Sequence, residues 1–113
     1  MSRAVGASFE RLAADFLSHQ GLRVLESNYT CKGGEIDLVC DDHGTLVFVE
    51  VRARRGNRHG APEETVGTVK QRRLIHAARH YLMVRKIVDR PCRFDVVAVE
   101  GETIRHYPDA FQT

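Results

Sequence analysis

Three carboxylates and one arginine recur at short, regular spacing between residues 35 and 53. Glu35 and Asp37 are two residues apart, as are Glu50 and Arg52, and each pair lies in a run that alternates polar and apolar residues. Mg²⁺ is usually bound through one or two carboxylates, with water and phosphate oxygens completing its shell. The pattern therefore predicts a site for Mg²⁺ or Mn²⁺, provided that the two runs lie side by side.

Strand pairing decides whether these side chains meet. The turn at residues 41–44 predicts an antiparallel hairpin, in which directly opposed residue numbers have a constant sum. Only an odd sum places all the apolar side chains on one face. That buried face should hold Ile36, Leu38, Val47, Val49 and Val51. The same register places Glu35, Asp37, Glu50 and Arg52 on the other face, within about 5–8 Å of one another.

Facing carboxylates destabilise a sheet unless positive charge lies between them. A divalent cation is one source of that charge. The alternative is that Arg52 neutralises Glu50 or Glu35 on a solvated strand face, with no metal ion. The residues alone leave both interpretations open.

The hairpin also carries a resemblance. Residues 34–39 (GEIDLV) and 47–52 (VFVEVR) resemble the paired-strand signature of the PD-(D/E)xK nuclease superfamily, and the chain is similar nearly end to end to the YraN-type family of uncharacterised bacterial proteins. The matching residues outside the hairpin are Gly6, Glu10, Asn28, Gly60, Pro62, Lys70 and the run Arg93-Phe94-Asp95. This resemblance implies a restriction-endonuclease-like fold and metal-dependent hydrolysis of DNA, including branched or single-stranded substrates.

The resemblance also implies roles for single residues. Asp37 and Glu50 would bind the metal ion, and Glu10 would match the helical acid that completes the site in resolvase-like members. Arg52 stands where the motif has its lysine, and a guanidinium supplies charge but cannot act as a base. Lys70 lies at the edge of an apolar helical stripe, so it could point toward the sheet and supply the missing amine.

The departure at Arg52 keeps other functions open. One is a catalytically inactive nucleic-acid-binding or protein-assembly module with the same fold. Another is an α/β interaction domain without a nucleic-acid role. A homo-oligomer or a protein partner is compatible with each of them.

Positive charge is concentrated in the middle of the chain. Residues 52–90 have a net charge of +8, against −4 for residues 1–51 and −2 for residues 91–113, and 14 of the 17 cations are arginine. Arginine can contact phosphate through two parallel hydrogen bonds. We expect non-specific DNA binding through Arg54, Arg55, Arg58, Arg72 and Arg73, the alternative being a solvated basic helix.

These residues need a scaffold of seven elements. Hydrophobic periodicity predicts helices over residues 4–20 and 62–86, and strands over residues 22–29, 35–40, 45–53, 93–99 and 103–107. The order α-β-β-β-α-β-β predicts an α/β fold in which helices flank a mixed sheet, and the second helix connects two parallel strands. The 113 residues fit a single domain spanning 1–113.

Composition excludes several classes of protein. Hydrophobic residues make up 42% and charged residues 28%, which is ordinary for a soluble protein. No apolar run approaches the roughly 20 residues that span a bilayer, and no secretory signal is evident. We expect a cytoplasmic protein that does not bind membranes. The three cysteines lack CxxC spacing and are expected to be free thiols.

Overall fold

The computed structural model describes residues 2–54 and 67–112, with side chains described for residues 9–53 and 67–112. Its elements are α1 (Ser2–His19), β1 (Arg23–Cys31), β2 (Gly34–Asp42), β3 (Thr45–Arg54), α3 (Thr68–Val84), β4 (Cys92–Glu100) and β5 (Thr103–Phe111). This is the predicted order α-β-β-β-α-β-β, so the mixed α/β class is confirmed. In this part of the chain, no helix is both long and apolar enough to cross a membrane.

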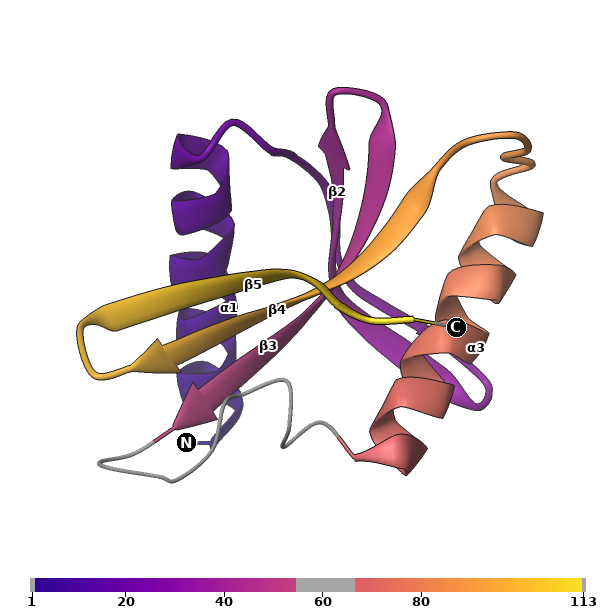
Figure 1. Ribbon diagram of the computed structural model, residues 1–113. Coiled ribbons are helices and arrows are strands. Elements are labelled where there is room, and N and C mark those ends of the chain that lie inside the picture. The colour runs from indigo at the N-terminus through magenta and orange to yellow at the C-terminus, as the bar shows by residue number, and fades with distance from the viewer. Residues whose placement is uncertain (1, 55–66, 113) are drawn as a thin grey trace.

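The five strands form one mixed sheet in the order β1-β2-β3-β4-β5. Neighbouring strands are antiparallel, except β3 and β4, which pair in parallel. Parallel strands need a crossover connection, and α3 belongs to it as predicted. Figure 1 shows α1 and α3 on opposite sides of the sheet. The central strands are therefore covered on both faces.

Most boundaries lie within two residues of those predicted, and two differ by more. Helix α3 begins at Thr68, after Gly67 in an extended conformation, and the predicted entry at Pro62 lies outside the described residues. Strand β5 continues to Phe111 although it contains Pro108. A proline is tolerated there because β5 is an edge strand, and the register shift opposite Phe94 accommodates the irregularity.

Two apolar clusters hold the helices to the sheet. Side chains between α1 and the sheet include Ala13, Leu17, Leu38, Val49 and Val97, and those between α3 and the sheet include Phe48, Leu74, Ala77, Tyr81 and Phe94. Phe48 and Val49 are neighbours on β3 and point to opposite clusters, as alternation along a strand requires. Full burial of one such side chain contributes about 1.5–3 kcal/mol.

The hairpin between β2 and β3 has the predicted odd register, with Leu38 opposite Val49. Pairing with β3 begins at this point, and Gly34, Glu35 and Ile36 before it pair only with β1. Leu38 packs on the α1 side with Val47 and Val49, as predicted, but Ile36 packs on the α3 side, so its predicted face is wrong. The alternation breaks beside Asn28, which lies between the partners of Leu38 and Ile36 on β1 and has a φ of 55°.

The start of β2 also approaches α3 closely. A Cβ atom on Gly34 would overlap the backbone carbonyl oxygen of Arg73 and would crowd Ala77. Glycine is therefore required if α3 is to keep this position. The contact holds α3 against the segment of β2 that carries Glu35 and Asp37.

Candidate active site

A cavity of about 320 Å³ lies where β2 and β3 separate. It is lined by Phe9, Glu10, Glu35, Asp37, Glu50, Val51, Ala53 and Lys70. The structure thus brings together the four acidic residues singled out in the sequence. They come from α1, β2 and β3, and α3 contributes the lysine.

Glu50 and Lys70 form the closest ion pair of the cavity. The Lys70 Nζ atom donates a hydrogen bond to Glu50 Oε2 at 2.7 Å. Glu50 is buried, with 7% of its surface exposed, while about half of the Lys70 side chain stays accessible. Lys70 therefore points from the first turn of α3 toward the sheet, and its ammonium lies at the cavity.

Asp37 forms no ion pair with any cation among the described side chains. Its Oδ2 atom accepts a hydrogen bond from the Val51 N–H at 2.8 Å. Burial and the negative charge of Glu50, with a smaller effect of Glu10, raise the pKa of Asp37 to about 7, although the Val51 hydrogen bond and Lys70 oppose the shift. The cavity therefore holds more negative charge than its own cations neutralise.

Glu35 is compensated by a different cation. Arg73 donates from Nη2 to Oε1 at 2.8 Å and from Nε to Oε2 at 3.2 Å. The hydrogen bond from Arg73 is the main reason why the pKa of Glu35 is lowered. Two cations of α3 thus neutralise Glu50 and Glu35, and neither of them compensates Asp37 fully.

The remaining donor set fits a hard divalent cation. Within residues 9–53 and 67–112, no group of three or more His, Cys, Asp and Glu side chains is arranged to hold a metal ion, so any cation here would rely on two carboxylates. Asp37 and Glu50, with Glu10 nearby, offer carboxylate oxygens only. Mg²⁺ and Mn²⁺ suit such a set because water and substrate oxygens supply the other ligands, whereas structural Zn²⁺ normally requires four protein ligands.

Arg52 is placed differently from what its spacing suggests. It is half-buried on β3 opposite Ala98 and does not line the cavity. Among the described side chains, no carboxylate forms an ion pair with it, so the expected neutralisation of Glu50 or Glu35 by Arg52 is wrong. Instead, Lys70 and Arg73 of α3 contact Glu50 and Glu35.

The predicted nucleic-acid contacts divide into two groups. Arg72 and Arg73 are exposed on α3. Arg54 ends β3, but its side chain lies outside the described residues, as do Arg55 and Arg58 altogether. The structure therefore describes only the part of the basic segment that belongs to α3.

Two histidines on α3 make polar contacts with the β1 region. His76 Nε2 lies 3.0 Å from the carbonyl oxygen of Lys32, and His80 Nδ1 lies 2.6 Å from the Tyr29 hydroxyl. Each histidine thus contacts β1 or the turn that follows it. The three cysteines are free thiols, as predicted.

A second charged cluster surrounds Asp95, which is completely buried on β4. It accepts hydrogen bonds from Arg93 and from His106. The signal for His106 was the short turn between β4 and β5, which sets His106 opposite Val97 and diagonal to Asp95. This cluster lines neither of the two described cavities.

Comparison with known proteins identifies the family. A protein of Burkholderia ambifaria named UPF0102 protein is 51% identical over 112 residues, which cover 98% of this chain and 78% of that protein. A protein of the same name from Chromohalobacter salexigens is 52% identical over 117 residues, covering 97% of this chain and 94% of the relative. The profile of the uncharacterised protein family UPF0102 matches residues 9–99. The resemblance to the YraN-type family is thereby confirmed, and the chain belongs to the UPF0102 family.

Proposed function

We propose that this protein is a nuclease that hydrolyses DNA phosphodiester bonds with the help of Mg²⁺ or Mn²⁺. The observation that carries the proposal is the contact of Lys70 Nζ with Glu50 Oε2 in the cavity that also contains Asp37. Two carboxylates for a cation and one ammonium for the phosphate form a minimal set for metal-assisted phosphodiester hydrolysis.

The proposed fold is restriction-endonuclease-like. Three features support it: the element order, the hairpin of β2 and β3 with carboxylates where the strands separate, and the parallel pairing of β3 with β4 across α3. A fold alone does not determine a function, so we infer hydrolysis from the side chains of the cavity.

Each residue has a distinct proposed role. A divalent cation held by Asp37 and Glu50 would polarise the phosphate and lower the pKa of a bound water molecule. Lys70 supplies a positive charge beside the phosphoryl oxygens, where negative charge develops in the transition state. Glu10 contributes from α1 and orients a ligand or water on the far side of the cavity.

Lys70, rather than Arg52, is the proposed cation of the motif. Its ammonium already contacts Glu50, whereas Arg52 does not line the cavity. A guanidinium, by contrast, cannot serve as a base in a protein. The arginine at position 52 is then compatible with activity, because the required amine comes from a different element.

Single-turnover cleavage tests the proposal. The assay uses Mn²⁺ and end-labelled single-stranded, flapped and four-way-junction DNA. Several DNA structures are compared because the sequence contains no recognised base-reading motif that would select one of them. Lys70→Gln should slow cleavage by about 10²-fold or more, since one electrostatic contact to the transition state is lost. Asp37→Asn and Glu50→Gln should abolish cleavage, and Arg52→Lys should retain it.

Glu102→Gln serves as the control, because Glu102 is exposed in the turn between β4 and β5, which lines neither described cavity. Thermal melts of all variants separate loss of activity from loss of folding. If the wild type and Arg52→Lys both leave every substrate intact, the nuclease proposal fails and the binding or assembly module takes its place.

A further inference from the structure

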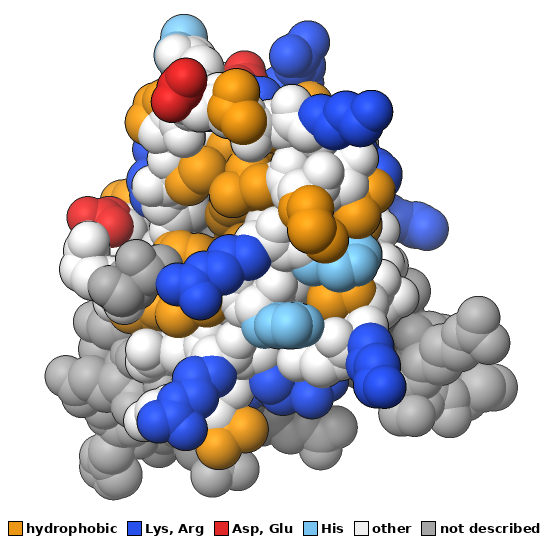
Figure 2. All heavy atoms as spheres, turned by 90° about the vertical axis from the view of Figure 1, so that its right-hand side faces the viewer, with side chains coloured by type: hydrophobic (Ala, Val, Ile, Leu, Met, Phe, Trp, Pro, Cys, Tyr) orange, Lys and Arg blue, Asp and Glu red, His pale blue; other side chains and the backbone are white. Residues whose placement is uncertain are grey.

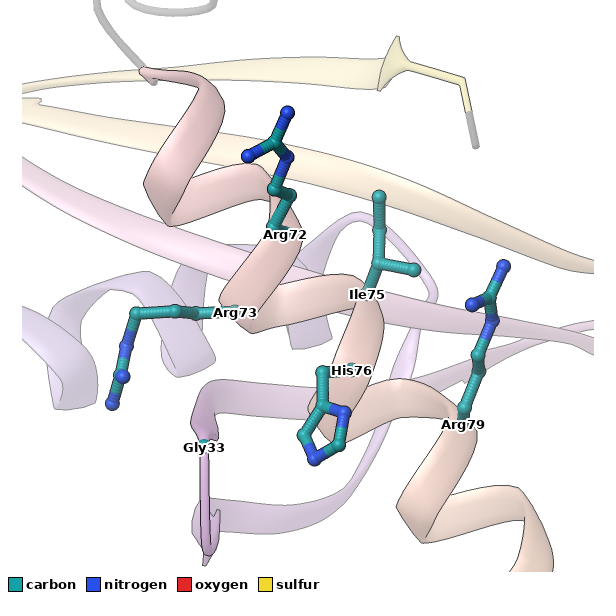
Figure 3. Close-up of a pocket in the computed structure, with 6 residues that line it drawn as sticks. All are labelled: Gly33, Arg72, Arg73, Ile75, His76 and Arg79. Carbon is teal, nitrogen blue, oxygen red and sulfur yellow. The ribbon is translucent and has the colours of Figure 1, made fainter.

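A second cavity, of about 550 Å³, lies on the outer face of α3 beside the turn between β1 and β2. Figure 3 shows the six residues that line it: Gly33, Arg72, Arg73, Ile75, His76 and Arg79. We call it the α3 groove. Figure 2 shows this side of the molecule, where Lys, Arg and His side chains spread over the surface.

Two arginines of the α3 groove are available for a ligand. Most arginines near the sheet are engaged; Arg73, Arg85 and Arg93, for example, form ion pairs with carboxylates. Among the described side chains, no carboxylate forms an ion pair with Arg72 or Arg79, and both are exposed. Their positive charge is therefore not neutralised within the described structure.

His76 and Gly33 shape the floor between these arginines. The carbonyl oxygen of Lys32 can only accept a hydrogen bond, so His76 Nε2 is the donor. In the neutral tautomer, Nδ1 is then left as an acceptor for a ligand. A Cβ atom on Gly33 would lie 3.1 Å from the His76 ring, and Gly33 has a φ of +94°. The turn and the His76 ring thus pack closely against each other and form the floor of the groove.

We propose that the α3 groove binds the phosphate backbone of the nucleic-acid strand whose scissile bond lies in the carboxylate cavity. This inference rests on the proposed function and adds the position of the substrate. Arg72 and Arg79 would each contact a phosphate, and Ile75 between them offers an apolar surface to a sugar or base.

The two cavities are adjacent. Arg73 lines the α3 groove, and its partner Glu35 lines the carboxylate cavity. Lys70 and Arg72 lie about 200° apart around the axis of α3, and Arg73 lies between them on the side of Glu35. A strand bound along the outer face of α3 therefore reaches Lys70 by crossing the helix over the Arg73–Glu35 ion pair.

The spacing of the arginines favours a nucleic acid over an acidic peptide. Arg72 and Arg79 are seven residues apart, which corresponds to about 10.5 Å along a helix axis. A nucleic-acid strand carries one phosphate at every nucleotide whatever its base, so two arginines on one helix face can contact phosphates of the same strand. The planar guanidinium is also well shaped for bidentate phosphate contact.

Fluorescence anisotropy with a labelled oligothymidylate in EDTA tests this binding without any cleavage. The double variant Arg72→Gln, Arg79→Gln should bind about 25-fold more weakly at 0.1 M salt, and its slope of log K against log salt should be shallower by about 1.4, which is about 0.7 for each lost contact to a single strand. Arg79→Gln alone should show about half of that change in slope.

The matched control is Arg11→Gln, Arg105→Gln, which removes the same charge from exposed residues on α1 and β5. The proposal predicts that this control binds like the wild type. Equal losses in both double variants, or equal affinity for an oligoglutamate of the same charge, would overturn it. The binding assay contains no metal ion, so it is independent of cleavage. Failure of the groove to bind DNA would not affect the cleavage experiment, and absence of cleavage would not affect the binding experiment.

Discussion

Asp95 and Asp37 are both aspartates on inner strands of the sheet, but their surroundings differ. Asp95 is completely buried and accepts hydrogen bonds from Arg93 at 2.9 Å, from His106 at 2.7 Å and from the Asp109 N–H at 2.9 Å. Asp37 accepts a hydrogen bond from the Val51 N–H and lies near the negative charge of Glu50.

The pKa values follow from these surroundings. Burial alone would raise the pKa of Asp95, but hydrogen bonds from His106, Arg93 and Asp109 lower it below the ordinary value. Asp37 is also buried in large part, and its pKa is raised to about 7 because its neighbours add negative charge. A carboxylate with a full set of donors stabilises a fold, whereas one with a deficit of positive charge is suited to bind a cation.

Removal of Asp95 should have the largest effect on stability. Asp95→Ala should lower the free energy of unfolding by about 3–5 kcal/mol, because it leaves the Arg93 charge without its buried partner. Since the folded-state pKa of Asp95 is lowered, its contribution is present above the ordinary pKa of 3.8 and is lost as the pH falls through the lowered value. Urea unfolding at pH 7 measures the loss, and a change below 1 kcal/mol would remove the contrast with Asp37.

A divalent cation should stabilise the region of Asp37 specifically. At a Mg²⁺ concentration 100 times its Kd, the wild type should gain about 2.7 kcal/mol. The double variant Asp37→Asn, Glu50→Gln should gain nothing in the same thermal melts. Asp95→Asn, if folded, is a suitable control, and it should retain the Mg²⁺ effect. Equal gains in the wild type and the Asp37, Glu50 variant would show that the cavity is not the site.

Asp37→Asn should stabilise the metal-free protein at high pH. The folded-state pKa of about 7 lies above the ordinary value of 3.8, so the folded protein holds an additional proton between these values. Wild-type stability therefore falls as the pH rises from about 4 through 7, whereas asparagine cannot ionise. The variant should be more stable by about 2 kcal/mol at pH 8 and similar near pH 4. Urea unfolding at both pH values in EDTA checks this, and a variant that is less stable at pH 8 would contradict it.

The exposed ion pair of Glu35 and Arg73 should have the smallest effect. About 45% of each side chain is exposed, so solvent screens the pair. Arg73→Gln should leave the melting temperature nearly unchanged in low salt. A large loss of stability would mean that Glu35, like Asp95, depends on its cationic partner for folding. Asp37 would then differ from both of these acids.

Much of the scaffold could be predicted from the sequence, because it depends on local patterns. Alternation over residues 35–53 was sufficient to predict the odd register, which places Leu38 opposite Val49. Helical periodicity was sufficient to predict both ends of α1 and the end of α3 within two residues, but not the start of α3. The proximity of Asp37 to Glu50 follows from that register and from the chemistry of the residues themselves.

Other features were decided only by the tertiary structure. Pairing between β2 and β3 ends at Leu38 and Val49, and the alternation of β2 breaks beyond that point, beside Asn28 with its φ of 55°, so Ile36 packs on the other face. The apolar stripe indicated that Lys70 could point toward the sheet, but only the packing of α3 against Gly34 decided that Lys70, and not Arg52, reaches Glu50. Spacing along the chain could not decide either result, because the first depends on a local backbone irregularity and the second on how a helix distant in sequence packs against β2.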